Sequence, residues 1–438
     1  MKSLSAVALL SLSAVVNAHG DHHHRRHNLV ARQNSASATR SFTYSGATNP
    51  TAIPLPSIVA GAVSRPVVPI ASTPAAGAKP TAGFSNAPGV PDLTEFRKNV
   101  LANKYPEGDK VPAVNSPEVL QWMEEVQNSG IQIPALETTV EGGSCQANLP
   151  LASDASRCWW TCNNCDAKED VVECNQPNHW GISFDDGPGF YTHELLDYLD
   201  QERLKATFFV VGSRVLYLPE VLQAEHIRGH QIAIHSWSHR PLTTLTTEQV
   251  IAELGWSKKI IKDTLGITPN QMRPPFGDMD ERVRKISLAM GLTPIMWTRS
   301  DGLVFNTEDF DVAGGTRTVQ QVLTNWQNII QAAGRLTDNG FLTLQHDLNQ
   351  QSIDIAAGYI IPDGLARQLT IEPVITCLDM PMANAYIETN DNTTNPPTAK
   401  LGIFNKKATS AGVSVTSGTL GSIFVGTALA FASLFAGF

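Results

Sequence analysis

The sequence predicts an α/β fold built on parallel strands, because short apolar segments alternate with helical segments between residues 176 and 380. We expect strands over residues 179–184, 206–211, 231–234, 292–297 and 341–344. The helices expected among them cover residues 191–201, 218–228 and 247–265. In parallel α/β folds the chemistry lies at the C-terminal ends of the strands, and the motifs described below fall there.

Length and charge exclude some classes of partner. The chain has 438 residues, enough for one large domain or two ordinary ones. Its net charge of −9 provides no basic surface for nucleic acid, so we expect no nucleic-acid partner. A hydrophobic content of 42% and a charged content of 17% are typical of a packed globular protein with few charged faces.

The N-terminal residues 1–18 have the pattern of a secretory signal peptide. Lys2 precedes an apolar run over residues 6–16, and the small-residue site Val16-Asn17-Ala18 follows it. A buried first helix is the alternative interpretation. It would have to end in the His- and Arg-rich residues 22–26, which is unusual for a core element. We therefore expect the protein to be secreted.

Two segments separate this leader from the predicted catalytic domain over residues 176–380. Residues 19–90 are rich in Ala, Ser, Thr, Pro and Val and poor in charge, which predicts a disordered, O-glycosylated stalk. Residues 91–175 form a helical and Cys-rich extension. Within it, residues 117–126 have the pattern of an amphipathic helix with Ser116 as the N-cap.

The C-terminal residues have the pattern of a glycosylphosphatidylinositol (GPI) attachment signal. Residues 420–438 carry no charge, and the small residues Ser410-Ala411-Gly412 lie upstream. This predicts an anchor at Ser410 and removal of a propeptide over residues 413–438, although a transmembrane helix would also fit by length. Residues 381–412 are polar and contain a glycosylation sequon at Asn392, which predicts a linker.

Six cysteines in a chain expected to be secreted predict disulfides, and the sequence leaves their pairing open. The Cys162-x-x-Cys165 spacing beside two further cysteines is also compatible with a zinc knuckle. Five cysteines precede the first catalytic strand and one lies far downstream, so at least one disulfide should join the two ends of the domain. The six are Cys145, Cys158, Cys162, Cys165, Cys174 and Cys377.

Two motifs contain the side chains of a metal-dependent hydrolase. Asp185 and Asp186 end an apolar strand and precede Gly187-Pro188, a turn that allows both carboxylates to face one cavity. His235 and His239 follow another strand and lie on one face if the segment is helical. One Asp and two His can hold a divalent ion and leave a position open for water. The other Asp is then free to accept a proton from that water.

Three further features accompany these motifs. The loop Arg273-Pro274-Pro275-Phe276-Gly277 is stiffened by two prolines, and its guanidinium can hold a carboxylate in a bidentate pair and depress the pKa of that carboxylate. The apolar strand over residues 341–344 leads to His346, a candidate general acid. Trp237 lies between the two histidines, and its ring is of a type that stacks on sugar faces.

These motifs together resemble the polysaccharide deacetylase family, carbohydrate esterase family four, and within it the fungal chitin deacetylases. Five motifs occur in the family's order across residues 176–380. The resemblance implies a distorted (β/α) barrel. It also implies that Asp185 is the catalytic base and that Asp186, His235 and His239 are the metal ligands. The mixture of His and carboxylate ligands favours Zn²⁺ or Co²⁺ over Mg²⁺ or Ca²⁺.

The resemblance assigns the remaining roles residue by residue. Arg273 would orient the base, the backbone N–H of Phe276 would stabilise the oxyanion, Leu344 would line the acetyl pocket and His346 would be the general acid. One motif departs from the family pattern. Where the family has an Asp-Trp pair, this chain has Asp301 and, after an insertion, Asp309-Phe310. We expect Asp309 to be the partner of His346 because it precedes an aromatic residue.

The function implied is removal of acetyl groups from N-acetylglucosamine polymers such as chitin, with chitin oligomers and cell wall polysaccharide as partners. Two alternatives remain open at the level of the sequence. One is an O-acetyl esterase that acts on another glycan such as xylan, and the other is an inactive wall polysaccharide-binding protein. We expect the protein at the cell membrane through its GPI anchor, with transfer to the cell wall as a further option.

Overall fold

The computed structural model describes residues 73–80, 84, 86–140 and 145–390. The expected signal peptide, most of the expected stalk, the sequon at Asn392, the expected anchor site at Ser410 and the predicted propeptide over residues 413–438 lie outside these residues. Among the described residues, no helix combines the length and the apolar character needed to cross a membrane.

The strands form two parallel sheets and a small hairpin. One sheet has the order β2-β3-β4-β5-β6, the second has the order β10-β1-β9, and the antiparallel pair β7-β8 stands apart. Isolated parallel bridges at Asp185–His346 and Asn306–Leu344 extend the pairing between distant segments. The strand bounds are His179–Gly181 (β1), Ser183–Asp185 (β2), Thr207–Val210 (β3), Gln231–Ile234 (β4), Gln271–Met272 (β5), Thr293–Pro294 (β6), Arg299–Ser300 (β7), Leu303–Val304 (β8), Phe341–Leu342 (β9) and Thr370–Glu372 (β10).

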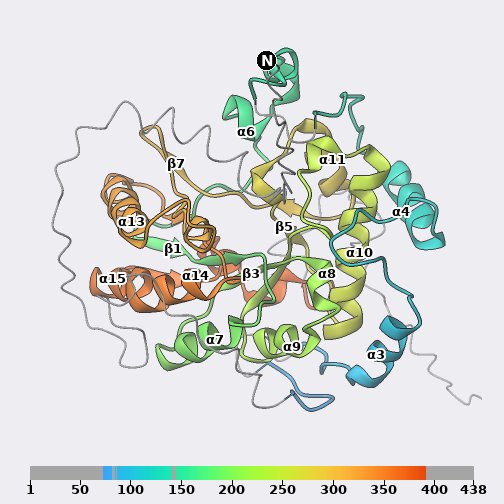
Figure 1. The fold of residues 1–438 in the computed structure, drawn as a ribbon, viewed down its shortest axis with the longest axis horizontal. Helices are drawn as coiled ribbons and strands as arrows, with labels where there is room; N and C mark the ends of the chain where they lie inside the picture. The colour runs from blue at the N-terminus through green and yellow to red at the C-terminus, as the bar shows by residue number, and fades with distance from the viewer. Residues whose placement is uncertain (1–72, 81–83, 85, 141–144, 391–438) are drawn as a thin grey trace, which may run out of the picture. The chain divides into compact units, whose positions relative to one another are not determined.

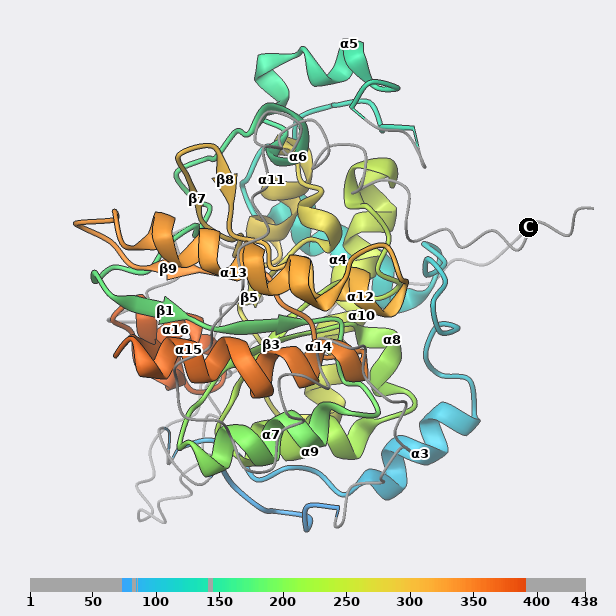
Figure 2. The same cartoon turned by 60° about the vertical axis from the view of Figure 1, so that its left-hand side comes forward.

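Helices surround these strands, with α7 and α9 together on one side and α10 beside α8 on another (Figures 1 and 2). Helices α3 and α4 lie on the outer side of α10. The main helices are α3 (Leu93–Leu101), α4 (Pro117–Asn128), α7 (Thr192–Gln201), α9 (Pro219–Ile227), α10 (Thr247–Leu265), α11 (Glu281–Ala289) and α13 (Val319–Ala333). A further run joins α14 (Gln350–Ile355), the π-helical segment η4 (Ala356–Ile360) and α15 (Ile361–Ala366).

The described residues also form several short helices. They are α5 (Leu149–Ala152), η1 (Ala155–Arg157), α6 (Trp160–Asn163), α8 (Gly212–Val215), η2 (Leu242–Thr244), η3 (Pro275–Gly277), α12 (Phe310–Ala313), α16 (Val374–Cys377) and η5 (Met382–Ala385). The alternation of parallel strands with helices confirms the predicted α/β fold. The segment expected as one strand over residues 179–184 forms two strands, because Ile182 separates β1 and β2, which pair in different sheets.

Local sequence explains the bounds of the long helix α10. Thr246 and Gln249 form a capping box at its start, in which each side chain satisfies a backbone N–H of the other residue. Gly266 follows the last turn with a φ of +79°, a left-handed conformation that glycine adopts without steric cost. The predicted cap of α4 is confirmed as well, since the Ser116 hydroxyl accepts from the N–H of Val119 at 3.3 Å.

The predicted flanking segments are wrong where they meet the domain. Residues 84–90 were expected to belong to a disordered stalk, but Phe84 is buried and stacks on Tyr386 with ring centroids 5.5 Å apart. Residues 381–390 were expected to be a polar linker, but they include η5 and the fully buried Tyr386. The Tyr386 hydroxyl accepts from the N–H of Ile232 at the start of β4. Aromatic residues thus pack parts of both segments against the domain, although the overall composition of the segments is polar or small.

All six cysteines form disulfides. They pair as Cys145–Cys162, Cys158–Cys165 and Cys174–Cys377. The bridge from Cys174 to Cys377 spans 203 residues and confirms the expectation that one disulfide joins the two ends of the domain. The alternative of a zinc knuckle at Cys162 and Cys165 is wrong, because no free cysteine remains.

Candidate active site

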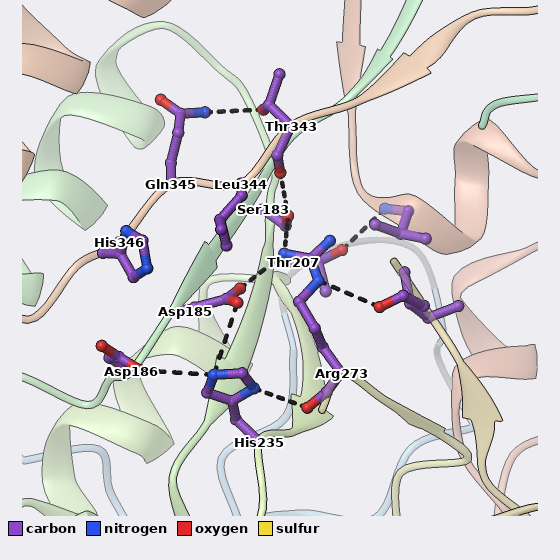
Figure 3. Close-up of polar contacts among 12 residues, drawn as sticks. Ser183, Asp185, Asp186, Thr207, His235, Arg273, Thr343, Leu344, Gln345 and His346 are labelled. Carbon is purple, nitrogen blue, oxygen red and sulfur yellow. Dashed lines mark hydrogen bonds and ion pairs between the residues drawn. The ribbon is translucent and has the colours of Figure 1, made fainter. Parts of the chain in front are cut away.

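A cavity lies at the C-terminal ends of the strands, as expected for a parallel α/β fold. Figure 3 shows how Asp185, Asp186, His235 and His346 lie, with Arg273 beside Asp185 on the side away from His346. The residues that line the cavity are Asp185, Asp186, His235, His239, Phe276, Trp297, Asn306, Glu308, Phe310, Asp311, Leu344 and His346. The structure therefore brings nearly all of the predicted site residues together.

The backbone explains how two adjacent carboxylates reach the same cavity. Asp185 is the last residue of β2, and its N–H donates to the carbonyl of Gln345 at 2.9 Å. Asp186 then adopts a φ of +80°, in the left-handed region that aspartate tolerates better than most residues. In a continuing strand the two side chains would point to opposite faces. The left-handed turn at Asp186 instead directs both carboxylates to the cavity.

Asp186, His235 and His239 form a candidate metal site. Asp186 Oδ1 lies 3.5 Å from His235 Nε2 and 3.0 Å from His239 Nε2, and one ligand atom of each residue lies within 4.8 Å of the others. This Asp186 oxygen is buried and accepts no hydrogen bond. His235 Nδ1 lies 2.7 Å from the carbonyl of Arg273, which requires a proton on Nδ1 and leaves the lone pair of Nε2 facing Asp186. These features fit a divalent metal ion.

A second layer of contacts holds the loop that carries the two histidines. The loop is not helical, because Ser236 and His239 have φ values of +60° and +55°, so the helical spacing considered for it does not apply. The buried carboxylate of Glu253, on α10, accepts from the backbone N–H groups of Trp237 and Ser238, each at 2.8 Å. It also accepts from the Ser238 hydroxyl at 2.5 Å. Glu253 therefore fixes the loop without contacting the cavity itself.

Asp185 is a buried carboxylate that remains basic. Arg273 Nη1 donates to its Oδ1 at 2.7 Å, and no second nitrogen of the guanidinium contacts it in the described structure, so the predicted bidentate pair is wrong. Burial raises the pKa of Asp185 to about 6, and the nearby Arg273 only partly opposes this rise. The Arg273 guanidinium does lower the pKa of Asp185, as expected, but the desolvation of this buried carboxylate outweighs that effect and makes the net shift upward.

Arg273 is held rigidly behind Asp185. Its other hydrogen bonds go to the carbonyls of Ile295 and Met296, at 3.2 and 3.0 Å, and to the Ser183 hydroxyl at 2.8 Å. The guanidinium also lies over the ring of Phe209, 4.1 Å from its centroid. The side chain is fully buried. These contacts hold the guanidinium in place, so that it donates to the Asp185 carboxylate from one fixed position.

His346 lines the same cavity as the candidate metal ligands and pairs with Asp309. His346 Nδ1 lies 2.9 Å from Asp309 Oδ1, and the backbone N–H of His346 donates to Asp309 Oδ2 at 2.9 Å. Burial alone would lower the pKa of His346, but the Asp309 carboxylate and its hydrogen bond raise it to about 9. Asp301, the other aspartate that the sequence left open, pairs with Arg335 on the surface.

The remaining predicted residues divide into two groups. Phe276 and Leu344 line the cavity, and the Phe276 ring lies 4.7 Å from that of His239. Trp237 does not line the cavity. It is fully buried, its indole N–H donates to the carbonyl of Glu107, and it packs near Trp256. The prediction that Trp237 stacks on a sugar face is therefore wrong, because its neighbours on the core side leave the ring no exposed surface.

The insertion after Asp301 supplies a wall of the cavity that the motifs did not identify. Asn306 and Glu308 come from it, and Phe310 and Asp311 follow it directly after Asp309. Glu308 forms an ion pair with Arg317, with Nε 2.8 Å from Oε2. The sequence signal for this wall was the interruption of the Asp-Trp motif itself, which placed extra residues beside the partner of His346.

Comparison with known proteins agrees with this geometry. A family model described as polysaccharide deacetylase matches residues 173–295. Chitin deacetylase 1 of Cryptococcus neoformans var. grubii is 45% identical over 364 residues, which cover 81% of this chain and 75% of that protein. Chitin deacetylase of Amylomyces rouxii is 37% identical over 200 residues, covering 44% of this chain and 46% of that protein.

A solved chitin deacetylase from the fungal pathogen Colletotrichum lindemuthianum can be superposed with a TM-score of 0.45 at 23% identity, covering 50% of this chain and 94% of that one. The family match contains Asp185, Asp186, His235, His239 and Arg273, and the long match to the Cryptococcus protein extends well beyond it. Sequence similarity of this extent, together with the arrangement of the site, shows that the chain belongs to the polysaccharide deacetylase family.

Proposed function

We propose that this protein hydrolyses the N-acetyl groups of N-acetylglucosamine residues in chitin and releases acetate and free amines. The observation that carries the proposal is that one basic carboxylate, Asp185, lines the same cavity as a candidate metal site and the protonatable His346. The names of the relatives, which are chitin deacetylases, support chitin as the substrate.

Asp186, His235 and His239 would hold the metal ion, and their mixture of imidazole and carboxylate favours Zn²⁺ or Co²⁺. When bound, such an ion supplies a Lewis acid for the acetyl carbonyl and makes water easier to deprotonate. The Arg273 carbonyl keeps His235 in the required tautomer, and the Glu253 carboxylate keeps the histidine loop in place.

The chain's own acid and base would move the protons. Asp185, with a pKa of about 6, is ionised at neutral pH and still basic enough to accept a proton from the attacking water. His346, with a pKa of about 9, is protonated at neutral pH and can donate a proton to the leaving amine nitrogen. The backbone N–H of Phe276 would donate to the oxyanion of the tetrahedral intermediate. Leu344 would contact the acetyl methyl group.

Acetate release from chitin oligomers tests the proposal. We expect the wild-type protein to produce equal amounts of acetate and free amine, and the Asp185→Asn variant to produce neither above background. Acetate release from acetylated xylan without release from chitin oligomers would favour an O-acetyl esterase. Binding to chitin without acetate release from either substrate would favour a polysaccharide-binding protein.

We also propose that the protein is secreted and attached to the cell membrane by a GPI anchor near Ser410. Three disulfides are expected of a protein that folds in an oxidising compartment, which supports the secretory route. The uncharged residues 420–438 after a small-residue site support the anchor. Release of the protein from membranes by a GPI-specific phospholipase tests it. Recovery of peptides from residues 420–438 in the mature protein would show a transmembrane tail instead.

A further inference from the structure

The disulfide-bonded segment over residues 145–165 packs directly against the loop that carries Phe276. Two disulfides, Cys145–Cys162 and Cys158–Cys165, enclose the short helix α6. This segment precedes the region that matches the family model, which begins at residue 173. Nothing in the mechanism proposed above uses it.

Hydrogen bonds from Trp159, Trp160 and Thr161 connect this segment to the residues immediately after Phe276. The Trp160 N–H donates to the carbonyl of Met279 at 2.8 Å, and the Thr161 hydroxyl donates to the carbonyl of Gly277 at 3.1 Å. The Trp159 indole N–H donates to Asp278 Oδ1 at 2.8 Å. The other oxygen of Asp278 accepts from the backbone and hydroxyl of Thr243, at 2.9 and 2.6 Å, so the loop is held from two sides.

The loop needs this support because its backbone is in an uncommon conformation. Phe276 has a φ of +60° and Gly277 has a φ of +65°. A non-glycine residue in the left-handed region is strained, and it persists where the surroundings determine it. A side chain at Gly277 could not fit, because its Cβ would lie 2.6 Å from the Trp160 ring. The Trp160 indole therefore occupies the space that a side chain at this position would need.

Trp160 also reaches the wall of the cavity. Its ring meets that of Trp297 edge-to-face with centroids 4.6 Å apart, and Trp297 lines the cavity. The Arg299 guanidinium lies 3.5 Å above the Trp160 ring, and its Nη2 donates to the Trp160 carbonyl at 2.9 Å. Arg299 thus packs on the Trp160 ring, and the same ring also contacts Gly277 and Trp297.

We propose that the segment over residues 145–165 positions the backbone N–H of Phe276 for the oxyanion, with Trp160 as the main positioning residue. The proposal rests on the proposed function for its catalytic meaning, because only a reaction with an oxyanion uses this N–H. Its structural content is independent of the substrate: without Trp160, the loop over residues 273–279 loses the surface that maintains its left-handed turn.

Hydrogen–deuterium exchange and kinetics on one set of variants test the proposal. The set contains Trp160→Ala, Trp160→Phe, Thr161→Val and, as a matched control, Trp122→Ala. Trp122 is another buried tryptophan, which packs on Gly255 and Trp256 away from the cavity. For Trp160→Ala we expect faster exchange in the peptide that contains Phe276 and a fall in kcat of about tenfold. This is less than the ~10²–10³-fold loss typical when an oxyanion donor is removed, since the donor is displaced and not deleted.

In the same variant, KM for a short chitin oligomer and the amount of bound metal should change less than twofold. Trp160→Phe should restore most of kcat, and Thr161→Val should lower it by about threefold, a milder change that keeps the test available if Trp160→Ala does not fold. Trp122→Ala should lower Tm without lowering kcat. Unchanged exchange near Phe276 in both Trp160→Ala and Thr161→Val would overturn the proposal, as would an equal loss of kcat in Trp122→Ala. If exchange increases as expected but the wild type releases no acetate, the positioning stands and the proposed function fails.

Discussion

The two sides of the cavity are built in different ways. On the metal side, Asp186, His235 and His239 are held by backbone groups and by the buried Glu253, and each ligand follows a strand of one parallel sheet. On the acid side, His346 is held mainly by one carboxylate, that of Asp309, which follows the insertion after Asp301. The first arrangement depends on all three ligands at once, whereas the second depends on one hydrogen-bonded pair. We therefore expect all-or-none losses on the metal side and graded losses on the acid side.

Loss of a metal ligand should have the largest effect. Asp186→Ala or His239→Ala should lose bound metal and reduce turnover to background, because two remaining ligands hold the ion weakly. Exhaustive chelation of the wild type should do the same, and Zn²⁺ or Co²⁺ should restore activity. Elemental analysis with acetate assays measures this, and His193→Ala, on α7 outside the cavity, is the control. Full turnover in a metal-free sample would contradict the proposed site.

Asp185→Asn should have the next largest effect on turnover. This variant keeps the shape of the side chain but cannot accept the proton, and a general base typically contributes ~10²–10⁴-fold to turnover. Bound metal should remain, since Asp185 is not one of the three predicted ligands. The comparison of kcat with metal content separates this residue from Asp186. Near-wild-type turnover would mean that another group is the base.

Glu253→Gln should weaken metal binding without removing the site. The two N–H groups share Oε2, which the amide oxygen can replace, but the amide then places an NH2 group where Oε1 accepts from the Ser238 hydroxyl and removes the negative charge that strengthens all three bonds. Loss of a supporting contact of this kind typically costs ~10–100-fold in metal affinity. Titration with a competing chelator measures the change. Glu248→Gln, in the first turn of the same helix, serves as the control and should keep the wild-type affinity.

The pair on the acid side should give the smallest effect, a shift in pH dependence. Asp309 raises the pKa of His346, and the protonated imidazole is the form that donates to the leaving amine. Turnover should therefore fall as the pH rises through about 9. Asp309→Asn removes the charge that favours the protonated form, so the pKa of His346 should drop and the alkaline limb should move to lower pH. Asp301→Asn should leave the limb in place, because Asp301 pairs with Arg335 on the surface. A shift with Asp301→Asn alone would reverse the pairing inferred for catalysis.

The sequence was most informative where a motif directly follows a strand that can be recognised in the sequence. Asp185-Asp186 and the two histidines follow strands whose apolar character is visible in the sequence, so their convergence could be predicted from the rule for parallel sheets. The fold class could be predicted from the same alternation. The pKa of Asp185 could not, because its direction depends on complete burial, which a local pattern does not reveal.

Tertiary contacts decided the features that the sequence misjudged. Trp237 looked like a sugar-stacking residue beside the histidines, yet its environment is set by Glu107 and Trp256, which are distant in the chain. Phe84 and Tyr386 lie in segments of unremarkable composition and become ordered through each other, 302 residues apart in numbering (386 − 84). The role proposed for Trp160 was equally hidden, because its partner Gly277 belongs to another motif.

The contacts of Tyr386 show where the end of the described domain lies relative to the cavity. Tyr386 bonds to Ile232, near the start of β4, and Ile387 bonds to Thr268, which precedes β5. His235 and Arg273, in contrast, follow the last residues of β4 and β5. Described residues near 390 and the cavity are thus at opposite ends of the sheet. If the domain were immobilised through this end, for example on an assay bead, its cavity would open away from the support, toward a polymer presented from solution.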